Sequence, residues 1–312
     1  MSEDVAGALS RAVQAGSVQR EAPLAPLTTF KVGGPAEWLV ETGRAAEVTQ
    51  IAAVARGFGL PLTVIGGGSN LLVSDRGVRG IVVRIRGGGV RQERQNTVSA
   101  DAGVTINGLV RWTIARGLAG LELWAGTPGT VGGAIYGNAH FGSRMIGDLV
   151  ARATLAALDG SVSEVDGGEM EFGYDTSRLQ RTREILLSAD FVVTEGEPAA
   201  LRRTARESLA YRKRTQPLHM PSAGCIFQNP DPAHEKLPEG VPYSAGALVD
   251  RAGLKGRRIG GALVSPGHAN FIVNDGGATA ADIRALIERC REAVFKRFGI
   301  RLRDEIVCIG EF

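Results

Sequence analysis

The sequence lacks the cysteine and histidine spacings that hold metals or disulfides. Its three cysteines, Cys225, Cys290 and Cys308, form no C-x-x-C pair, and its four histidines are scattered. Zinc sites need closely grouped ligands, and disulfide frameworks need regularly spaced cysteines. We therefore expect no metal site, no disulfide and a reducing compartment. Cys290 lies in a helical stretch and Cys308 in a strand, where packing is the expected role.

Long apolar runs and clustered basic residues are also missing. The N-terminal stretch MSEDVAGALSRAV begins with acidic residues and has no apolar core of a signal peptide. No apolar run approaches the length of a membrane span. The net charge of +3 and the pI of about 8.9 are only mildly basic. We therefore expect a cytoplasmic monomer that binds an anionic small molecule, and neither a nucleic acid nor a membrane.

Glycine, in contrast, is abundant: 43 of 312 residues, gathered in short clusters. A chain of this length suits two or three subdomains. Changes in composition predict subdomains at 1–85 and 86–196 and a further domain at 197–312. Apolar periodicity predicts helices at 3–15, 45–57, 106–116 and 198–214, and the capping box Thr279-x-x-Asp282 opens a further long helix. It predicts strands on both sides of Gly33-Gly34-Pro35 in 28–42 and at 62–65, 80–85, 97–100, 152–157 and 303–310.

The first glycine cluster, VIGGGSNLLV (64–73), follows a predicted buried strand. Successive glycine N–H groups can form an anion-binding nest, with Ser69 and Asn70 as further donors. The cluster is not a Rossmann fingerprint, because Leu71 stands where the third glycine belongs, and it lacks the Gly-Lys of a P-loop. A phosphate-binding loop and a tight turn are both open at this point. The candidate cofactor residues of this cluster are Gly66, Gly67, Gly68, Ser69, Asn70 and Leu71.

The second glycine cluster, AGTPGTVGGAIYGNAHFG (125–142), favours the phosphate interpretation. Its bulky Ile135 and Tyr136 argue against a disordered linker. Glycine-rich backbone can approach a flat, extended ligand closely and bond its edge atoms. Two such loops favour a long cofactor with a diphosphate and a ring system, such as FAD, over a mononucleotide. The candidate cofactor residues here are Thr127, Pro128, Gly129, Thr130, Gly132, Gly133, Ala134, Gly137 and Asn138.

The turn-like stretch PSAGCIFQNP (221–230) presents Cys225 behind two small residues, Ala223 and Gly224, that do not screen its thiol. The cysteine spacing disfavours metal and disulfide roles, which leaves packing, nucleophile or acid. A thiol has an ordinary pKa of about 8.5, so it is largely protonated at neutral pH and yet gives up a proton readily.

Six segments that occur in order resemble the UDP-N-acetylenolpyruvoylglucosamine reductase (MurB) family. They cover the chain from about residue 27 to its end: TTFKVGGPA, VIGGGSNLLVSD, AGTPGTVGGAIYGNA, QP…PSAGCIFQNP, AGALVDRAGLKGRRIGGALVSPGHANFIVN and LRDEIVCIG. The segment between Ser177 and Gln216 is too short for the tyrosine-bearing loop of some members, so the chain resembles the shorter type. The stretch DPAHEKLPEGVPY (231–243) is an unusual insert.

The resemblance implies a fold and a reaction. The fold is α+β, with a vanillyl-alcohol-oxidase-like (PCMH-type) FAD-binding domain of two α/β subdomains and a C-terminal α+β substrate-binding domain. The reaction is that of a UDP-N-acetylmuramate dehydrogenase: NADPH reduces FAD, and the flavin passes hydride to the enolpyruvyl ether of UDP-N-acetylglucosamine for peptidoglycan synthesis. Related oxidases often attach flavin covalently through histidine. His140 is the one histidine in a glycine cluster here, so we expect FAD to be non-covalent.

The resemblance also implies catalytic residues. Cys225 occupies the position of the family's serine acid, and Glu305 matches its catalytic glutamate. The third family residue is an arginine that follows a tyrosine and stabilises the enediolate, but here Asp175 follows Tyr174. We expect Arg178 to replace it, provided that the chain from Tyr174 to Arg178 forms a helical turn.

For the UDP-sugar, the resemblance and the charge of the side chains indicate a set of candidate residues. They are Tyr174, Arg212, Lys213, Gln216, Asn229, Lys255, His268 and Asn270. Surface cations and a buried structural histidine are the alternatives to these assignments. Two other functions are open: another FAD oxidoreductase, such as an alcohol oxidase, and a nucleotide-sugar-binding protein without catalysis, which is consistent with Asp175.

Overall fold

The computed structural model describes residues 2–14 and 17–312, which form two compact units, each with its own apolar core. Each unit is assembled from separate stretches of chain. The first comprises Met1–Ala22, Ala36–Gly67 and Arg79–Tyr211, and the second comprises Pro23–Pro35, Gly68–Val78 and Arg212–Phe312. Every helix in the described ranges is too short or too polar to span a membrane.

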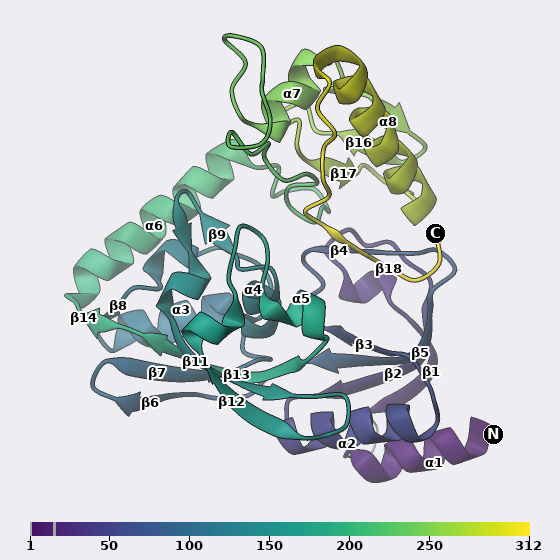
Figure 1. The fold of residues 1–312 in the computed structure, drawn as a ribbon, viewed down its shortest axis with the longest axis vertical. Coiled ribbons are helices and arrows are strands. Elements are labelled where there is room, and N and C mark those ends of the chain that lie inside the picture. Colours follow the sequence, from purple (N-terminus) through teal and green to yellow (C-terminus); the bar gives the residue numbers. More distant parts are fainter. Residues whose placement is uncertain (1, 15–16) are drawn as a thin grey trace. The chain divides into compact units, whose positions relative to one another are not determined.

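A four-stranded sheet and two helices begin the first unit. Its elements are α1 (Ser2–Ala12), β1 (Val18–Pro23), β2 (Pro35–Thr42), α2 (Ala45–Gly57), β3 (Leu62–Ile65) and β5 (Val78–Ile85). The strand order is β1-β2-β5-β3, and β3 and β5 run parallel. Helices α1 and α2 lie on one face of this sheet (Figure 1). The apolar spacing of α2 explains its position, because Val48, Ile51, Ala52 and Ala55 are all buried.

A five-stranded antiparallel sheet forms the other half of the first unit. Its elements are β6 (Val90–Arg94), β7 (Thr97–Asp101), α3 (Ile106–Ala115), α4 (Val131–Tyr136), β11 (Val150–Ala156), β12 (Val162–Asp166), α5 (Arg178–Thr182) and β13 (Ile185–Val192). The strand order is β12-β11-β13-β7-β6, and the three helices lie on one side of the sheet (Figure 1). The hydroxyl of Thr130 caps α4 by accepting from Gly133 N, so the second glycine cluster continues into a short helix.

Short elements complete the first unit and lead out of it. They are β8 (Leu118–Ala119), η2 (Glu122–Trp124), β9 (His140–Phe141), β10 (Arg144–Met145), η3 (Ile146–Leu149), η4 (Gly167–Met170) and β14 (Thr194–Glu195). The basic helix α6 (Pro198–Thr215) follows, and the division between the units falls within it, after Tyr211.

The second unit packs helices against a small sheet. Its elements are η1 (Ala25–Leu27), β4 (Leu71–Val73), α7 (Ala245–Arg251), β15 (Arg258–Ile259), β16 (Ala262–Val264), β17 (Ile272–Asn274), α8 (Ala280–Phe298) and β18 (Val307–Ile309). Helix α8 packs on the sheet β15-β16-β17 (Figure 1). Strand β18 pairs in parallel with β4, so the end of the chain returns to a segment near residue 71.

Cys290 and Cys308 have the packing roles expected from their surroundings. Cys290 lies on the buried face of α8, and burial raises the pKa of its thiol to about 12. Cys308 lies in β18 against the same core, and burial raises its pKa as well. Neither thiol is therefore suited to release a proton at neutral pH.

The structure confirms most predicted elements and corrects three. The capping box is present, since Thr279 Oγ1 accepts from Asp282 N and Asp282 Oδ2 accepts from Thr279 N. The strand expected before Gly33 is wrong, because 28–34 is irregular and bonds to a neighbouring loop instead. The final strand covers three residues rather than 303–310, and β3 is half-exposed rather than buried. The three-part division at 85 and 196 stays a prediction.

Gly68 occupies a tightly confined position in the second unit. Its φ is +64°, and a Cβ there would lie 2.1 Å from the carbonyl oxygen of Leu27. A left-handed alanine costs about 1–2 kcal/mol and overpacking a further 1–3 kcal/mol or so. We expect Gly68→Ala to lower the free energy of unfolding by about 2–5 kcal/mol, measured by urea unfolding with circular dichroism.

Gly240→Ala is the matched control for this substitution. Gly240 also has a positive φ, +73°, but a Cβ there would meet nothing within 4 Å. It should carry the backbone cost alone, so the difference between the two variants measures the contact with Leu27. Equal losses of stability would contradict a steric requirement for glycine at position 68.

Candidate active site

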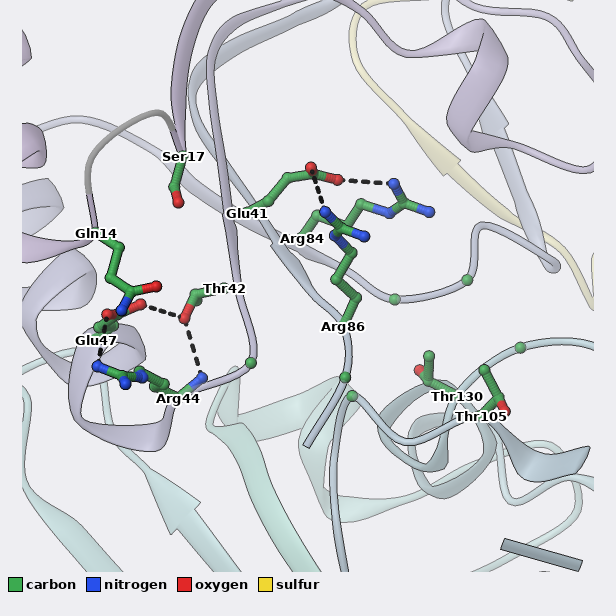
Figure 2. A pocket seen from close by; sticks show the side chains of 16 residues that line it. Gln14, Ser17, Glu41, Thr42, Arg44, Glu47, Arg84, Arg86, Thr105 and Thr130 are labelled. Atoms are coloured by element: carbon green, nitrogen blue, oxygen red, sulfur yellow. Dashed lines mark hydrogen bonds and ion pairs between the residues drawn. The ribbon is translucent and has the colours of Figure 1, made fainter. Parts of the chain in front are cut away.

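Residues of both glycine clusters line one cavity in the first unit (Figure 2). Gly66 and Gly67 follow the end of β3, and Gly129 and Thr130 directly precede α4. The cavity volume of about 740 Å³ lies within the usual range for ligand pockets. The structure thus brings together four residues predicted to bind the cofactor.

The two clusters approach each other so closely that side chains are excluded. A Cβ on Gly67 would lie 2.7 Å from Gly129 Cα, and one on Gly66 would lie 2.3 Å from Thr130 Oγ1. Both separations are too short for packed carbon atoms, so glycine is required at these positions. Bare backbone therefore lines this part of the cavity, and peptide N–H groups in glycine-rich turns are good donors to phosphate.

Charged side chains from β2, β5 and the start of α2 line the rest of the cavity (Figure 2). Arg84 and Arg86 lie 2.7 and 3.3 Å from the carboxylate of Glu41, and Arg44 lies 3.7 Å from Glu47. Three guanidinium groups against two carboxylates leave a surplus of positive charge, which suits a diphosphate. These arginines were not predicted, although the alternation R-I-R at the end of β5 places two of them on one face.

The rest of the first cluster belongs to the second unit. Asn70 Nδ2 donates to Glu305 O at 3.0 Å, and the Asn70 carbonyl accepts from Val307 N at 2.9 Å. Leu71 begins β4 and pairs with Val307. Asn70 therefore positions the backbone at Glu305. The cofactor contacts predicted for this part of the cluster stay predictions, and they concern Gly68, Ser69, Asn70 and Leu71.

Asn138 fixes the end of the second cluster. It is 1% exposed and has a φ of +44°. Its Nδ2 donates to Gly173 O at 2.8 Å, and its Oδ1 accepts from Gly147 N at 2.8 Å. The amide is thus engaged by the protein's own backbone. The remaining cofactor contacts predicted for this cluster stay predictions, and they concern Thr127, Pro128, Gly132, Gly133, Ala134, Gly137 and Asn138.

The structure places Cys225 and Glu305 on neighbouring strands of backbone in the second unit. The chain after Cys225 pairs in antiparallel fashion with the chain around Glu305. Ile226 O accepts from Glu305 N at 2.8 Å, and Phe227 forms a β-bridge with Asp304. Cys225 is partly exposed. Two of the three predicted catalytic residues are therefore neighbours.

Asn270 fixes the backbone of Ile226 and Phe227, directly after Cys225, through hydrogen bonds. It is 3% exposed, and its backbone carbonyl accepts from Ile226 N at 2.8 Å. Its Oδ1 accepts from Phe227 N at 3.0 Å, and its Nδ2 donates to Phe227 O at 2.8 Å. Asn270 therefore holds the backbone that follows Cys225, while its predicted contact with substrate stays a prediction.

Arg212 is the charged neighbour of Cys225. It lies on α6 and is 7% exposed. Burial lowers the pKa of the Arg212 guanidinium, and the electrostatic interaction with Cys225 opposes that shift. A cation beside a cysteine stabilises the thiolate relative to the thiol. Arg212 is therefore the candidate cation for a thiolate at Cys225.

The other predicted substrate residues of the second unit have protein partners. Asn229 Oδ1 accepts from Ala245 N at 3.0 Å at the start of α7, and Lys255 Nζ lies 2.7 Å from Asp250 Oδ2. An ion pair of this kind leaves further N–H groups of the ammonium available. Their contacts with substrate stay predictions, as do those of Lys213 and Gln216 at the end of α6.

The helical turn expected before Arg178 is wrong. Residues 174–177 form a turn in which Asp175 has a φ of +56°, and α5 begins only at Arg178. The Arg178 guanidinium donates to both oxygens of Glu184, at 2.7 and 3.0 Å. Asp175 instead lies 3.1 Å from His140 Nδ1. The geometry thus engages Arg178 with Glu184 and pairs Asp175 with His140.

Comparison with known proteins defines the class of this protein. Residues 36–166 match the FAD binding domain family, and residues 216–309 match the C-terminal domain of UDP-N-acetylenolpyruvoylglucosamine reductase. The glycine backbone and surplus guanidinium charge of the cavity fit the diphosphate of FAD. The protein is a flavoprotein oxidoreductase with a PCMH-type FAD-binding domain, as the sequence predicted.

Relatives define the family. UDP-N-acetylenolpyruvoylglucosamine reductase 1 of Bacillus anthracis is 39% identical over 297 residues, 95% of each chain. The reductase of Synechococcus sp. (strain JA-3-3Ab) is 39% identical over 310 residues, 99% of this chain and 96% of its own. The crystal structure of the Thermus caldophilus enzyme (MurB) has a TM-score of 0.78 at 33% identity and covers 94% of this chain and 99% of its own. The chain belongs to the UDP-N-acetylenolpyruvoylglucosamine reductase (MurB) family, and the resemblance drawn from its motifs is confirmed.

Gly67 tests the cavity as the FAD site. We expect Gly67→Ala to weaken FAD binding by about ten- to a hundredfold, because overpacking costs about 1–3 kcal/mol and 1.4 kcal/mol or so corresponds to tenfold. The added methyl group would force the two glycine clusters apart. Titration of the deflavinated protein with FAD, followed by flavin fluorescence, measures the dissociation constant.

Gly57→Ala provides the control for the FAD titration. Gly57 ends α2, has nothing within 4 Å of an added Cβ and does not line the cavity. Its dissociation constant for FAD should equal that of the parent protein. If Gly67→Ala binds FAD as the parent does, the cavity is not the diphosphate site.

His268 gives the second unit a pH-dependent stability. The centroid of its ring lies 4.8 Å from the centroid of the Phe271 ring, and burial lowers the pKa of His268. Below about pH 6.5 the unfolded chain protonates this histidine while the folded protein keeps it neutral. The unfolded state then binds more protons, so stability falls as the pH drops from about 6.5 toward the lowered pKa.

We expect His268→Gln to lose less stability than the parent between about pH 7 and pH 5. The substituted amide has no proton to gain in this interval, so its contribution does not change. Urea unfolding at several pH values measures the difference. Parallel curves for the two proteins would show that His268 does not titrate differently in the folded and unfolded states.

Proposed function

We propose that this chain is a UDP-N-acetylmuramate dehydrogenase. It uses NADPH and FAD to reduce the enolpyruvyl group of UDP-N-acetylglucosamine enolpyruvate, and the product is a precursor of peptidoglycan. Membership of the reductase family carries the proposal. The pairing of the Cys225 turn with the Glu305 segment supports it, because the reaction needs an acid and a carboxylate near each other.

FAD supplies hydride transfer when bound, from NADPH to the terminal carbon of the enolpyruvyl group. Within the first unit, we assign the hold on its diphosphate to the glycine backbone and the arginines of the cavity. Gly66, Gly67 and Gly129 offer peptide groups, and Arg84 and Arg86 offer guanidinium N–H groups. Arg84 and Arg86 share Glu41, which orients both side chains.

Cys225 donates the proton that completes the reduction. Hydride addition leaves a pair of electrons on the carbon beside the carboxylate, as an enediolate. The Sγ–H bond breaks, a C–H bond forms at that carbon, and the thiolate is then reprotonated from solvent. Arg212 stabilises the thiolate, and we assign hydrogen bonding and proton handling beside the substrate carboxylate to Glu305, whose backbone pairs with the Cys225 turn.

The cellular setting and assembly follow from the same chemistry. We place the protein in the cytoplasm, where NADPH and reduced thiols occur together, as a monomer with non-covalent FAD and with no nucleic-acid or membrane partner. We assign the two sheets of the first unit to FAD-binding subdomains, 1–85 and 86–196, and residues 197–312 to substrate binding.

Cys225→Ala tests the acid directly in anaerobic stopped-flow experiments. NADPH should reduce the flavin at the parent rate, because this half of the reaction needs no thiol. The enolpyruvyl substrate should re-oxidise the flavin about 10²- to 10⁴-fold more slowly, the usual contribution of a general acid. The flavin absorbance follows both steps.

Two further variants complete the Cys225 experiment. Cys225→Ser should keep much of the rate, because it restores the serine found in the family. Cys308→Ala removes a thiol that packs against the core and should leave re-oxidation unchanged. If Cys225→Ala re-oxidises as fast as the parent, Cys225 is not the acid. If the parent flavin is not re-oxidised by this substrate at all, the proposed reaction itself is wrong.

A further inference from the structure

A histidine–aspartate pair lies at the end of the second glycine cluster. His140 Nδ1 is 3.1 Å from Asp175 Oδ1. The His140 ring also packs on the ring of Tyr174, with 5.1 Å between centroids. His140 lies on β9, directly after the glycine-rich backbone, and Asp175 lies in the turn before α5. This pair was not predicted from the sequence.

Asp175 is buried and only half-satisfied. Its side chain is 8% exposed, whereas that of His140 is 28% exposed. Asp175 Oδ1 faces the imidazole, and Oδ2 has no hydrogen-bond partner. A buried carboxylate is costly unless a cation compensates it. Asp175 is therefore matched to a positively charged partner, and His140 is the residue at ion-pair distance from it.

The turn that carries Asp175 is held in place by the glycine-cluster backbone. Ser177 Oγ donates to Tyr136 O at 2.8 Å, and Asn138 Nδ2 donates to Gly173 O at 2.8 Å. The φ of Asp175, +56°, is uncommon for a residue other than glycine. Backbone in this region persists where its surroundings fix it, often at functional sites. The backbone that carries Asp175 is therefore fixed by the surrounding structure.

The chemistry of such a pair is defined by the two ring nitrogens. When Nδ1–H donates to a carboxylate, Nε2 points away from it, and the protonated ring offers Nε2–H as a charged donor. The ring of Tyr174 and the carboxylate of Asp175 contact His140 directly. Titratable or charged groups on neighbouring elements include Tyr136 at the end of α4, Arg144 on β10, Asp148 in η3, Arg178 and Arg181 on α5 and Tyr211 on α6. Asp175 lies at ion-pair distance from the ring, while Arg178 is engaged by Glu184.

We propose that the His140–Asp175 pair binds the carboxylate of the enolpyruvyl substrate and stabilises the enediolate, with His140 as the catalytic cation and Asp175 as the residue that positions it. This inference rests on the proposed function. Hydride adds to the terminal carbon, the electron pair moves onto the carboxylate oxygens, and His140 Nε2–H donates a hydrogen bond to one of them. The acid of the proposed reaction then protonates the neighbouring carbon, and His140 keeps its own proton throughout.

His140→Ala and His140→Gln test the cation, using the flavin-loaded enzyme in anaerobic stopped flow. In His140→Ala, reduction by NADPH should be unchanged and re-oxidation by the enolpyruvyl substrate about 10²- to 10³-fold slower, as for loss of one donor to a developing oxyanion. His140→Gln keeps a neutral donor, so we expect an intermediate rate that does not vary with pH where the parent rate does.

Asp175→Asn tests the positioning role through the pH profile. In the parent, re-oxidation should slow as the pH rises, because the neutral ring cannot donate from both nitrogens. Asp175→Asn removes the carboxylate that favours the imidazolium, so the same decline should occur at lower pH. Calorimetric binding of UDP-N-acetylmuramate, which carries the same carboxylate, should weaken with rising pH in the parent and show no such dependence in His140→Gln.

The chain offers a matched control in its unusual insert. His234 Nδ1 lies 2.8 Å from Asp231 Oδ2, but this pair is on the surface, with the His234 side chain 81% exposed. His234→Ala removes an aspartate-paired imidazole and should change neither the rate nor the pH profile. Melting temperature and bound flavin are measured for each variant, so that a folding defect is recognised.

The possible outcomes separate the inference from the proposed function. A parent enzyme that reduces the enolpyruvyl substrate, together with slow re-oxidation in His140→Ala and a flat profile in His140→Gln, supports the pair as the enediolate cation. Parent-like re-oxidation in His140→Ala, or a parent-like pH profile in His140→Gln, would overturn it while leaving the reaction intact. Loss of flavin from both His140 variants would also overturn it and assign His140 to cofactor binding.

Discussion

The chemistry of the second unit depends on one stretch of antiparallel backbone pairing. The hydrogen bond from Glu305 N to Ile226 O and the bridge between Phe227 and Asp304 place Cys225, the proposed acid, and Glu305 on adjacent strands. Asn270 fixes one side of this ladder with three hydrogen bonds. Side chains on paired strands are positioned with little freedom, which is what proton transfer at a defined carbon requires.

Positive charge is used in two different forms in the first unit. In the glycine-lined cavity, Arg84 and Arg86 share the carboxylate of Glu41, and their guanidinium groups remain charged at any physiological pH. In the proposed His140–Asp175 pair, the cation is instead the imidazole of His140 on β9, which lies beside a buried carboxylate. An arginine binds a permanent anion such as a diphosphate without regard to pH. An imidazole is better matched to charge that appears and disappears during a reaction.

Local patterns predicted the parts of the structure that depend on local spacing. The helices, the Thr279 capping box and the glycine clusters all follow from residues a few positions apart. The His140–Asp175 pair does not, because its members are 35 residues apart and are brought together by long-range contacts such as those of Asn138 and Ser177. The turn at Asp175 was misjudged for a related reason: a left-handed aspartate interrupts a helical turn without any change in apolar periodicity.

The parallel pairing of β4 with β18 has a consequence for how the chain is made. Asn70, one residue before β4, bonds to Glu305 across a sequence separation of 235 residues. During synthesis, β4 and the fully buried Leu72 emerge long before their partner strand exists. Contacts of such high separation form slowly, because a long loop must close first. The unit that carries the proposed acid is therefore completed last, after the cofactor-binding unit has had time to fold around its own core.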